Sequence, residues 1–205
     1  MATPREEIIA NLGPLAALAG VWVGDKGDDL APDDDRRGIE NNKFRERMTF
    51  EPFGPTDNHE QKLWGLRYTT TAWRIGAPDP FHEEMGYWLW DPKAKQVMRC
   101  FLVPRGIALI AGGTAEANAK SFEMKAELGS PIYGICSNPF LDEEFKTVKY
   151  TCMVSCTDGE TLTYDSDTWI QIKGQKELFR HRDRNTLKRE KAPAKVAAQE
   201  TAETF

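Results

Sequence analysis

Long apolar runs are missing from this sequence, and so is a secretory signal. No stretch approaches the roughly 20 apolar residues that a helix needs to cross a bilayer. The first ten residues place acids before a short apolar stretch and have no long apolar core, which is unlike a signal peptide. The expected location is therefore cytoplasmic, with no membrane partner.

Cysteine is scarce, with only four residues in a chain of 205. Cys152 and Cys156, if they share a strand, stand about 13 Å apart at ~3.3 Å per residue, which is too far for a disulfide. The spacing of the cysteines and histidines does not match a zinc site. We therefore expect buried free thiols in a reducing compartment.

Positive charge is in the minority, and the common catalytic signatures are absent. The 27 Lys and Arg residues against 32 Asp and Glu give a net charge of -5, and a mildly acidic surface repels phosphate, so no nucleic-acid partner is expected. The sequence has no G-x-S-x-G elbow, phosphate loop or HExxH helix. The proportions of hydrophobic residues (40%) and charged residues (29%) are those of one ordinary globular domain.

Alternation with a period of two dominates the chain after Gly20. Short turns separate the alternating segments, and Asp158-Gly159 is the clearest hairpin turn. Sequential strands with little helix to cover a sheet edge favour closure into a barrel. The fold class is therefore all-β, an antiparallel up-and-down (calycin-like) barrel of about ten strands with a short N-terminal helix. The expected strands are residues 20–25, 43–52, 62–74, 83–91, 95–103, 106–113, 120–128, 145–156, 160–172 and 178–189.

Other segments depart from this period. Residues 1–19 form a helical lead-in broken at Gly13-Pro14, with leucines at helical spacing, and are expected to plug the barrel of residues 20–189. Residues 24–42 are rich in aspartate and are expected to form a solvated loop over one mouth. Residues 129–144 are expected to form an ordered excursion, and residues 190–205 a flexible tail.

The last strand separates into two rows with different surroundings. One row is basic and belongs in water: Arg180, Arg182, Arg184, Thr186 and Lys188. The opposite row therefore faces the interior: Phe179, His181, Asp183, Asn185 and Leu187. An inward histidine is more often a hydrogen-bonded structural residue than a metal ligand, and both interpretations stay open here.

Aromatic residues supply further inward candidates. Trp64 and Tyr68 lie on one face of a strand, and Trp88 and Trp90 share a face of the next, so their rings either line a cavity or fill a core. His82 lies at a strand entrance, where it can cap, pair with a carboxylate or face a ligand. A site of two histidines and one carboxylate would require His82 and His181 to converge. His59 lies in a polar turn and is expected to be solvated.

Several segments, in order along residues 15–189, resemble the nitrobindin family of haem-binding barrels, which are similar in shape to lipocalins and fatty-acid-binding proteins. The resemblance rests on the following segments: the G-x-W-x-G strand at Gly20-Val-Trp22-Val-Gly24 with its leading helix, Tyr68-Thr-Thr-Thr-Ala-Trp73, Phe81-His82-Glu-Glu84-Met-Gly86-Tyr87, Pro104-Arg-Gly106, Gly112-Gly113-Thr114, and His181 with Leu187-Lys188-Arg189. The resemblance implies haem b bound through His181, with the sixth iron position open to nitric oxide or peroxynitrite. Peroxynitrite isomerisation is implied only in this way.

Two other hypotheses compete with haem. In the first, the barrel binds a non-haem amphipathic small molecule. The apolar contacts would then come from Trp64, Tyr68, Trp88 and Trp90, and the polar orientation from His181, Asp183 and Asn185. In the second, the barrel is filled by its own side chains and acts through its surface.

Overall fold

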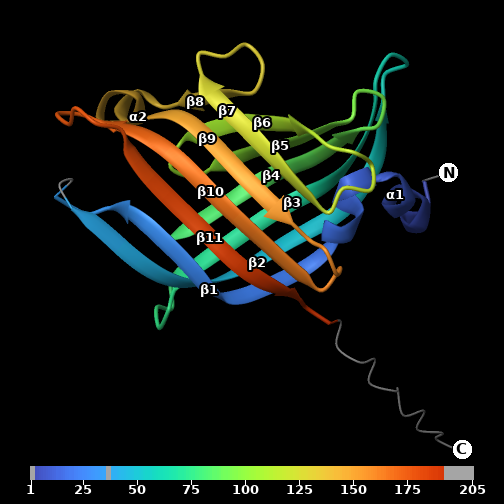
Figure 1. Ribbon diagram of the computed structural model, residues 1–205, viewed down its shortest axis with the longest axis horizontal. Coiled ribbons are helices and arrows are strands. Elements are labelled where there is room, and N and C mark those ends of the chain that lie inside the picture. The colour runs from blue at the N-terminus through green and yellow to red at the C-terminus, as the bar shows by residue number, and fades with distance from the viewer. Residues whose placement is uncertain (1–2, 36–37, 192–205) are drawn as a thin grey trace, which may run out of the picture.

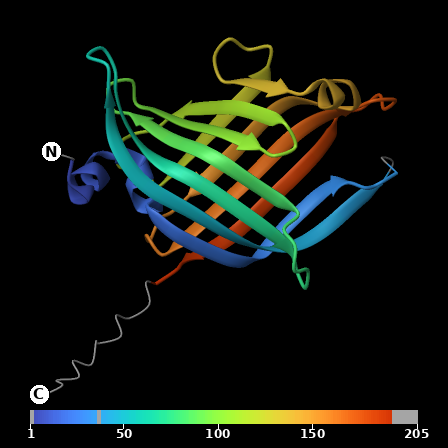
Figure 2. The same cartoon turned by 180° about the vertical axis from the view of Figure 1, so that it is seen from behind.

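A computed structural model describes residues 3–35 and 38–191. The chain forms a short helix, a 3-10 helix and eleven strands that close into a barrel (Figure 1). The elements are α1 (Arg5–Asn11), η1 (Gly13–Leu18), β1 (Gly20–Pro32), β2 (Ile39–Asp57), β3 (Lys62–Arg74), β4 (His82–Asp91), β5 (Gln96–Val103), β6 (Ile107–Thr114), β7 (Ser121–Leu128), β8 (Gly134–Ser137), α2 (Pro139–Glu144), β9 (Phe145–Ser155), β10 (Thr161–Ile172) and β11 (Phe179–Arg189). Seen from behind, β2 to β6 complete the wall (Figure 2).

The N-terminal segment closes one end of the barrel, as the leucine spacing predicts. Leu12, Leu15 and Leu18 are fully buried. Gly13 has φ +56°, and a Cβ there would lie 2.5 Å from the ring of Trp90, so the chain can pass this close only as glycine. The burial of these leucines makes the plug part of the hydrophobic core.

Two arginine hydrogen bonds and one from an indole fix the plug to the barrel. Arg189, at the end of β11, donates to the carbonyls of Ala17 and Ala19 at 2.6 Å, and Trp22 Nε1 donates to the Leu18 carbonyl at 2.7 Å. These bonds satisfy carbonyls at the end of η1 that the helix itself leaves unpaired.

The segment 129–144 contains β8, the strand that is not predicted from the sequence. Strand β8 pairs antiparallel with β6 and parallel with β7, so the sheet is mixed. The wholly antiparallel sheet predicted from the sequence is wrong in this respect. Helix α2 follows it and is capped by Asn138, whose side chain accepts from the Leu141 amide at 3.0 Å. A four-residue strand with a proline on each side gives too short an alternation to be recognised from sequence.

The predicted loop at residues 24–42 is wrong, because β1 runs to Pro32 and β2 begins at Ile39. Two of the acidic residues of this region are paired across the hairpin. Asp28 lies 3.0 Å from the Lys43 ammonium, and Asp29 accepts from the Asn42 side chain at 3.2 Å. Once such partners exist, aspartate no longer opposes a strand, and this pairing cannot be seen in the local composition.

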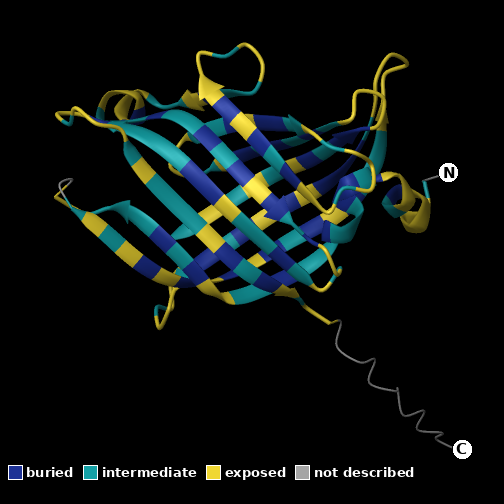
Figure 3. Ribbon diagram, in the orientation of Figure 1, coloured by how far each residue is buried: buried dark blue, intermediate teal, exposed yellow. Residues whose placement is uncertain are grey.

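Burial of the inward-facing side chains changes along the barrel axis (Figure 3). Near the plug, inward residues such as Trp22, Val97 and Leu187 have no solvent exposure. At the opposite end, the inward side chains of His82 and His181 are 36% and 32% exposed. Solvent therefore reaches inward-facing side chains at one end of the barrel. We call the interior region between Asp29, His82, His181 and Asp183 the open-end chamber.

The prediction of buried free thiols is only partly confirmed. All four cysteines are free, with Cys152 and Cys156 buried, Cys100 half-buried and Cys136 exposed, so the expectation of burial holds for only some of them. Within the described residues, neither helix has the length and apolar character that a membrane crossing requires.

Candidate functional site

The two rows predicted for β11 are found in the structure. Asn185 and Leu187 are buried inside, and His181 and Asp183 follow them toward the open end. On the outside, Arg180 and Arg182 contact Asp167 of β10. The basic row therefore stabilises the barrel wall by ion pairs, and the polar inward row faces the chamber.

His181 is paired with a buried carboxylate. Its Nε2 lies 2.6 Å from Oδ1 of Asp29, which is 5% exposed. Asp29 lies directly opposite Asp183 in the pairing of β1 with β11. Two carboxylates therefore lie side by side on the part of the wall that carries His181. Asn42 donates to the other oxygen of Asp29.

His82 is held in the same way on the far wall. Its Nε2 lies 3.0 Å from Oε1 of Glu84, whose other oxygen accepts from the Tyr68 hydroxyl at 2.6 Å and from the guanidinium of Arg99. Burial opposes the charged form of both groups. The charge of Arg99 nevertheless lowers the pKa of Glu84 to about 2, and the hydrogen bond and charge of Glu84 raise the pKa of His82 to about 9.

A third cluster joins two carboxylates through one phenol. The Tyr164 hydroxyl lies 2.9 Å from Oε2 of Glu46 and 3.0 Å from Oδ1 of Asp183. Asn185 and Thr70 donate to Glu46 at 3.0 and 2.8 Å. Burial raises the pKa of both carboxyl groups, and the charge of Asp183 adds to the effect on Glu46. A phenol has one proton, so it can donate to only one carboxylate, and the cluster favours retention of a further proton.

Both histidines influence the ionisation of Asp183 by their charge. The charges of His82 and His181 oppose the rise in the pKa of Asp183, which places both rings within electrostatic reach of it from opposite walls. The strand order puts β4 and β11 on different sides of the barrel, so tertiary closure alone brings them together. Each ring nevertheless contacts its own carboxylate, Glu84 or Asp29, and among the described residues no group of three His, Cys, Asp or Glu side chains is placed to hold a metal ion.

The predicted aromatic residues lie deeper than this chamber. Trp64 and Trp90 belong to the packed layer near the plug, and Trp90 lies against Gly13. Tyr68 and Trp88 lie in the next layer, and their ring centroids are 5.9 Å apart. His59 lies in the turn between β2 and β3, with no side-chain contact to the chamber among the described interactions.

Sequence reasoning missed Glu46, Glu84, Arg99 and Tyr164. A signal for Arg99 exists, because it interrupts the inward row Val97, Arg99, Phe101 of an otherwise apolar strand. A charge in such a row must find a buried partner. The same signal marks Glu46, which interrupts the inward row Phe44, Glu46, Met48 of β2.

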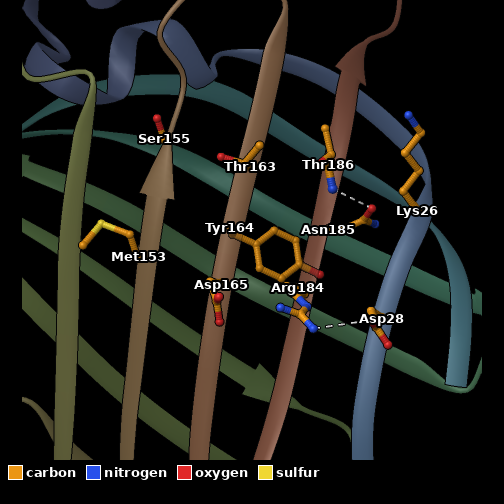
Figure 4. Close-up of a pocket in the computed structure, with 10 residues that line it drawn as sticks. All are labelled: Lys26, Asp28, Met153, Ser155, Thr163, Tyr164, Asp165, Arg184, Asn185 and Thr186. Carbon is orange, nitrogen blue, oxygen red and sulfur yellow. Dashed lines mark hydrogen bonds and ion pairs between the residues drawn. The ribbon is translucent and has the colours of Figure 1, made fainter. Parts of the chain in front are cut away.

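A shallow groove of about 340 Å³ lies on the outside of the wall (Figure 4). It covers the point where β1 and β11 lose register between Val23 and Asp28. Asp28 and Arg184 form an ion pair across it at 3.5 Å. The groove is open to solvent along the outer wall, and this ion pair already engages Arg184 and one oxygen of Asp28, so the groove is a weaker candidate than the chamber.

Comparison with known proteins identifies the family. The family model "THAP4-like, heme-binding beta-barrel domain" matches residues 11–189. The chain belongs to this family. The crystal structure of Rv2717c from M. tuberculosis is similar in fold, with a TM-score of 0.61 and 22% identity over 93% of this chain and 100% of that chain. No curated protein sequence matches the chain.

Membership supports a small-molecule ligand, and for the family as a whole a haem cofactor. A histidine that ligates a metal turns one ring nitrogen to the metal and the other to a partner. In both chamber histidines the outer nitrogen, Nε2, already contacts a carboxylate.

The inner ring nitrogen is a poor substitute for Nε2. Nδ1 is adjacent to Cβ, so a porphyrin bound there would collide with the strand. The donor set of the chamber, as arranged in this family member, therefore does not fit haem iron.

Proposed function

We propose that this barrel binds a small, non-haem amphipathic molecule in the open-end chamber. The observation that supports the proposal is the burial gradient along the barrel, with a sealed apolar end at Trp22 and Leu187 and solvent-reached inward side chains at His82 and His181. Ligand sites of this kind are concave and largely apolar, with a few polar groups that fix orientation.

The walls of the chamber divide these tasks between strands. Phe101 and Leu109, at 7% and 6% exposure, are opposite each other on β5 and β6 and supply apolar contact. His181 and Asp183 supply polar groups from β11. Asn185 lies deeper and orients Glu46 through its side-chain amide.

A neutral apolar dye tests the proposal. We expect N-phenyl-1-naphthylamine to gain fluorescence with the wild-type protein, because the dye leaves water for the chamber. Thr168→Trp should abolish the gain, since Thr168 is opposite His181 on the inward face and a tryptophan there fills the chamber. Thr69→Trp places the same ring on the exposed outer face and should leave the gain unchanged. If both variants keep the fluorescence gain, the dye does not bind inside the barrel and the proposal is refuted.

Haem b bound through His181, with the nitric oxide or peroxynitrite chemistry implied by resemblance, stays a separate hypothesis with its own prediction. We expect the absorption spectrum of added haem to be the same for the wild type and His181→Ala, because Asp29 occupies Nε2. Asp29→Asn removes the charge that holds this nitrogen and should give a haem band that disappears again in the Asp29→Asn, His181→Ala double variant. A wild-type band lost in His181→Ala alone would establish haem ligation and contradict our proposal.

A further inference from the structure

Two hydrogen-bond donors in the middle of the barrel have no acceptor. They are the indole nitrogen of Trp88 and Nε of Arg99. Trp88 is 3% and Arg99 6% exposed, and the two residues are directly opposite each other in the pairing of β4 with β5. Directly paired residues on one face of a sheet have Cβ atoms about 5 Å apart. The two orphaned donors therefore belong to one place in the fold.

The other donors of Arg99 are satisfied, which makes the exception informative. Nη2 donates to Tyr68 at 2.8 Å and to Glu84, and Nη1 donates to Tyr150. A buried donor without an acceptor costs about 1–3 kcal/mol, and native proteins contain few of them. Arg99 is linked to His82 of the chamber through Glu84, and this neighbouring pair of unpaired donors points to an acceptor supplied from outside the chain.

The charges of the interior favour an uncharged acceptor. The positive charge of Arg99 is already balanced by Glu84. Even with both imidazoles protonated, the interior groups joined by these contacts carry three positive charges against four carboxylates. The three are Arg99, His82 and His181, and the four are Asp29, Glu46, Glu84 and Asp183. Because Glu46 and Asp183 favour retention of one proton, these charges balance, and a ligand carboxylate would add a buried anion with no cation left to balance it.

The rings around Trp88 favour an apolar frame for the acceptor. Phe50 and Phe122 approach it edge-on, with ring centroids at 5.4 and 6.4 Å, and Tyr68 lies at 5.9 Å. These contacts make the surroundings of the Trp88 ring apolar, which suits an acceptor on an apolar frame.

We propose that Trp88 Nε1 and Arg99 Nε bind the carbonyl oxygen of an uncharged, largely apolar ligand that enters the open-end chamber carbonyl first. This inference rests on the proposed function and specifies the ligand class. Trp88 then provides a specific hydrogen bond in addition to apolar contact.

Three naphthalene probes of equal frame test the inference: 2-acetylnaphthalene, 2-ethylnaphthalene and 2-naphthoate. We expect the wild type to bind the ketone about 3–10-fold more tightly than the ethyl compound, the gain from a net hydrogen bond. Trp88→Phe should remove most of this preference while binding of the ethyl compound changes little. Trp169→Phe, a substitution of the tryptophan that lies beside Lys149 and Arg180, should keep the preference.

A spectroscopic readout on the wild type avoids dependence on any variant. The indole N–H resonance of Trp88 should shift on saturation with the ketone and much less with the ethyl compound. Equal affinities and equal shifts would mean that only water satisfies these donors, which overturns the inference and leaves the proposed function intact. Tighter binding of 2-naphthoate would overturn it in favour of an anionic ligand. Failure of all three probes, together with no dye uptake, would overturn the proposed function as well.

Discussion

Arg99→Met is expected to lower the free energy of unfolding by about 3–5 kcal/mol, because it leaves Glu84 as a buried charge without its main partner. The side chains of Arg99 and Glu84 are 7% and 10% exposed, so water cannot replace the lost guanidinium. Arg99 also packs against Phe101, with the guanidinium carbon 4.4 Å from the ring centroid. Methionine retains part of this apolar contact, which isolates the effect of charge. Urea denaturation at neutral pH measures the change.

Two further variants identify the cause of this loss. Arg99→Met combined with Glu84→Gln should recover much of the stability, because both charges are then absent. Arg67→Met makes the same change on the outer face, where Arg67 lies 3.6 Å from Glu51 and is 56% exposed. An exposed pair contributes about 0–1 kcal/mol, so this control should be nearly neutral. A loss below about 1 kcal/mol for Arg99→Met alone would show that the pair does not stabilise the fold.

Glu46→Gln should stabilise the protein at alkaline pH and have little effect near pH 5. Burial and then the charge of Asp183 raise the pKa of Glu46 from 4.5 to about 7. The folded protein then binds more protons than the unfolded chain between these values, so stability falls as the pH rises through this window. Glutamine removes the ionisation, and each unit of raised pKa corresponds to about 1.4 kcal/mol. The advantage of the variant should therefore grow to about 2 kcal/mol or more by pH 8.

Comparison within the same strand provides the control for Glu46. Glu51→Gln alters an outward carboxylate of β2 that is 62% exposed, and its effect should not change between pH 5 and pH 8. Subtracting the wild-type curve removes most of the contribution of His82, because the charge of Glu46 has a smaller effect on the pKa of His82 than Glu84 has. That contribution is positive below its ordinary pKa of 6.5 and is lost as the pH rises through about 9. A Glu46→Gln advantage that is equal at both pH values would contradict the assignment of a buried, proton-retaining carboxyl.

The strand pattern and one face of the site could be predicted from local sequence. Ten of the eleven strands show alternation, and the basic row of β11 assigns His181, Asp183, Asn185 and Leu187 to the interior. That assignment is possible because four cations on one side of a strand must either face solvent or pair with anionic side chains. The strand β8 was missed since four residues carry too little periodicity, and residues 24–42 were mistaken for a loop since their aspartates find partners across the hairpin.

Sequence by itself determined that this chain closes into a barrel with a plugged end and a polar inward row, because periodicity and turn residues are local properties. Only the tertiary structure decided which groups meet inside it. Glu46 and Asp183 are 137 positions apart and share the hydroxyl of Tyr164, while His181 reaches Asp29 across the β1–β11 seam. Such contacts depend on strand order and register around a closed sheet, which no single strand encodes.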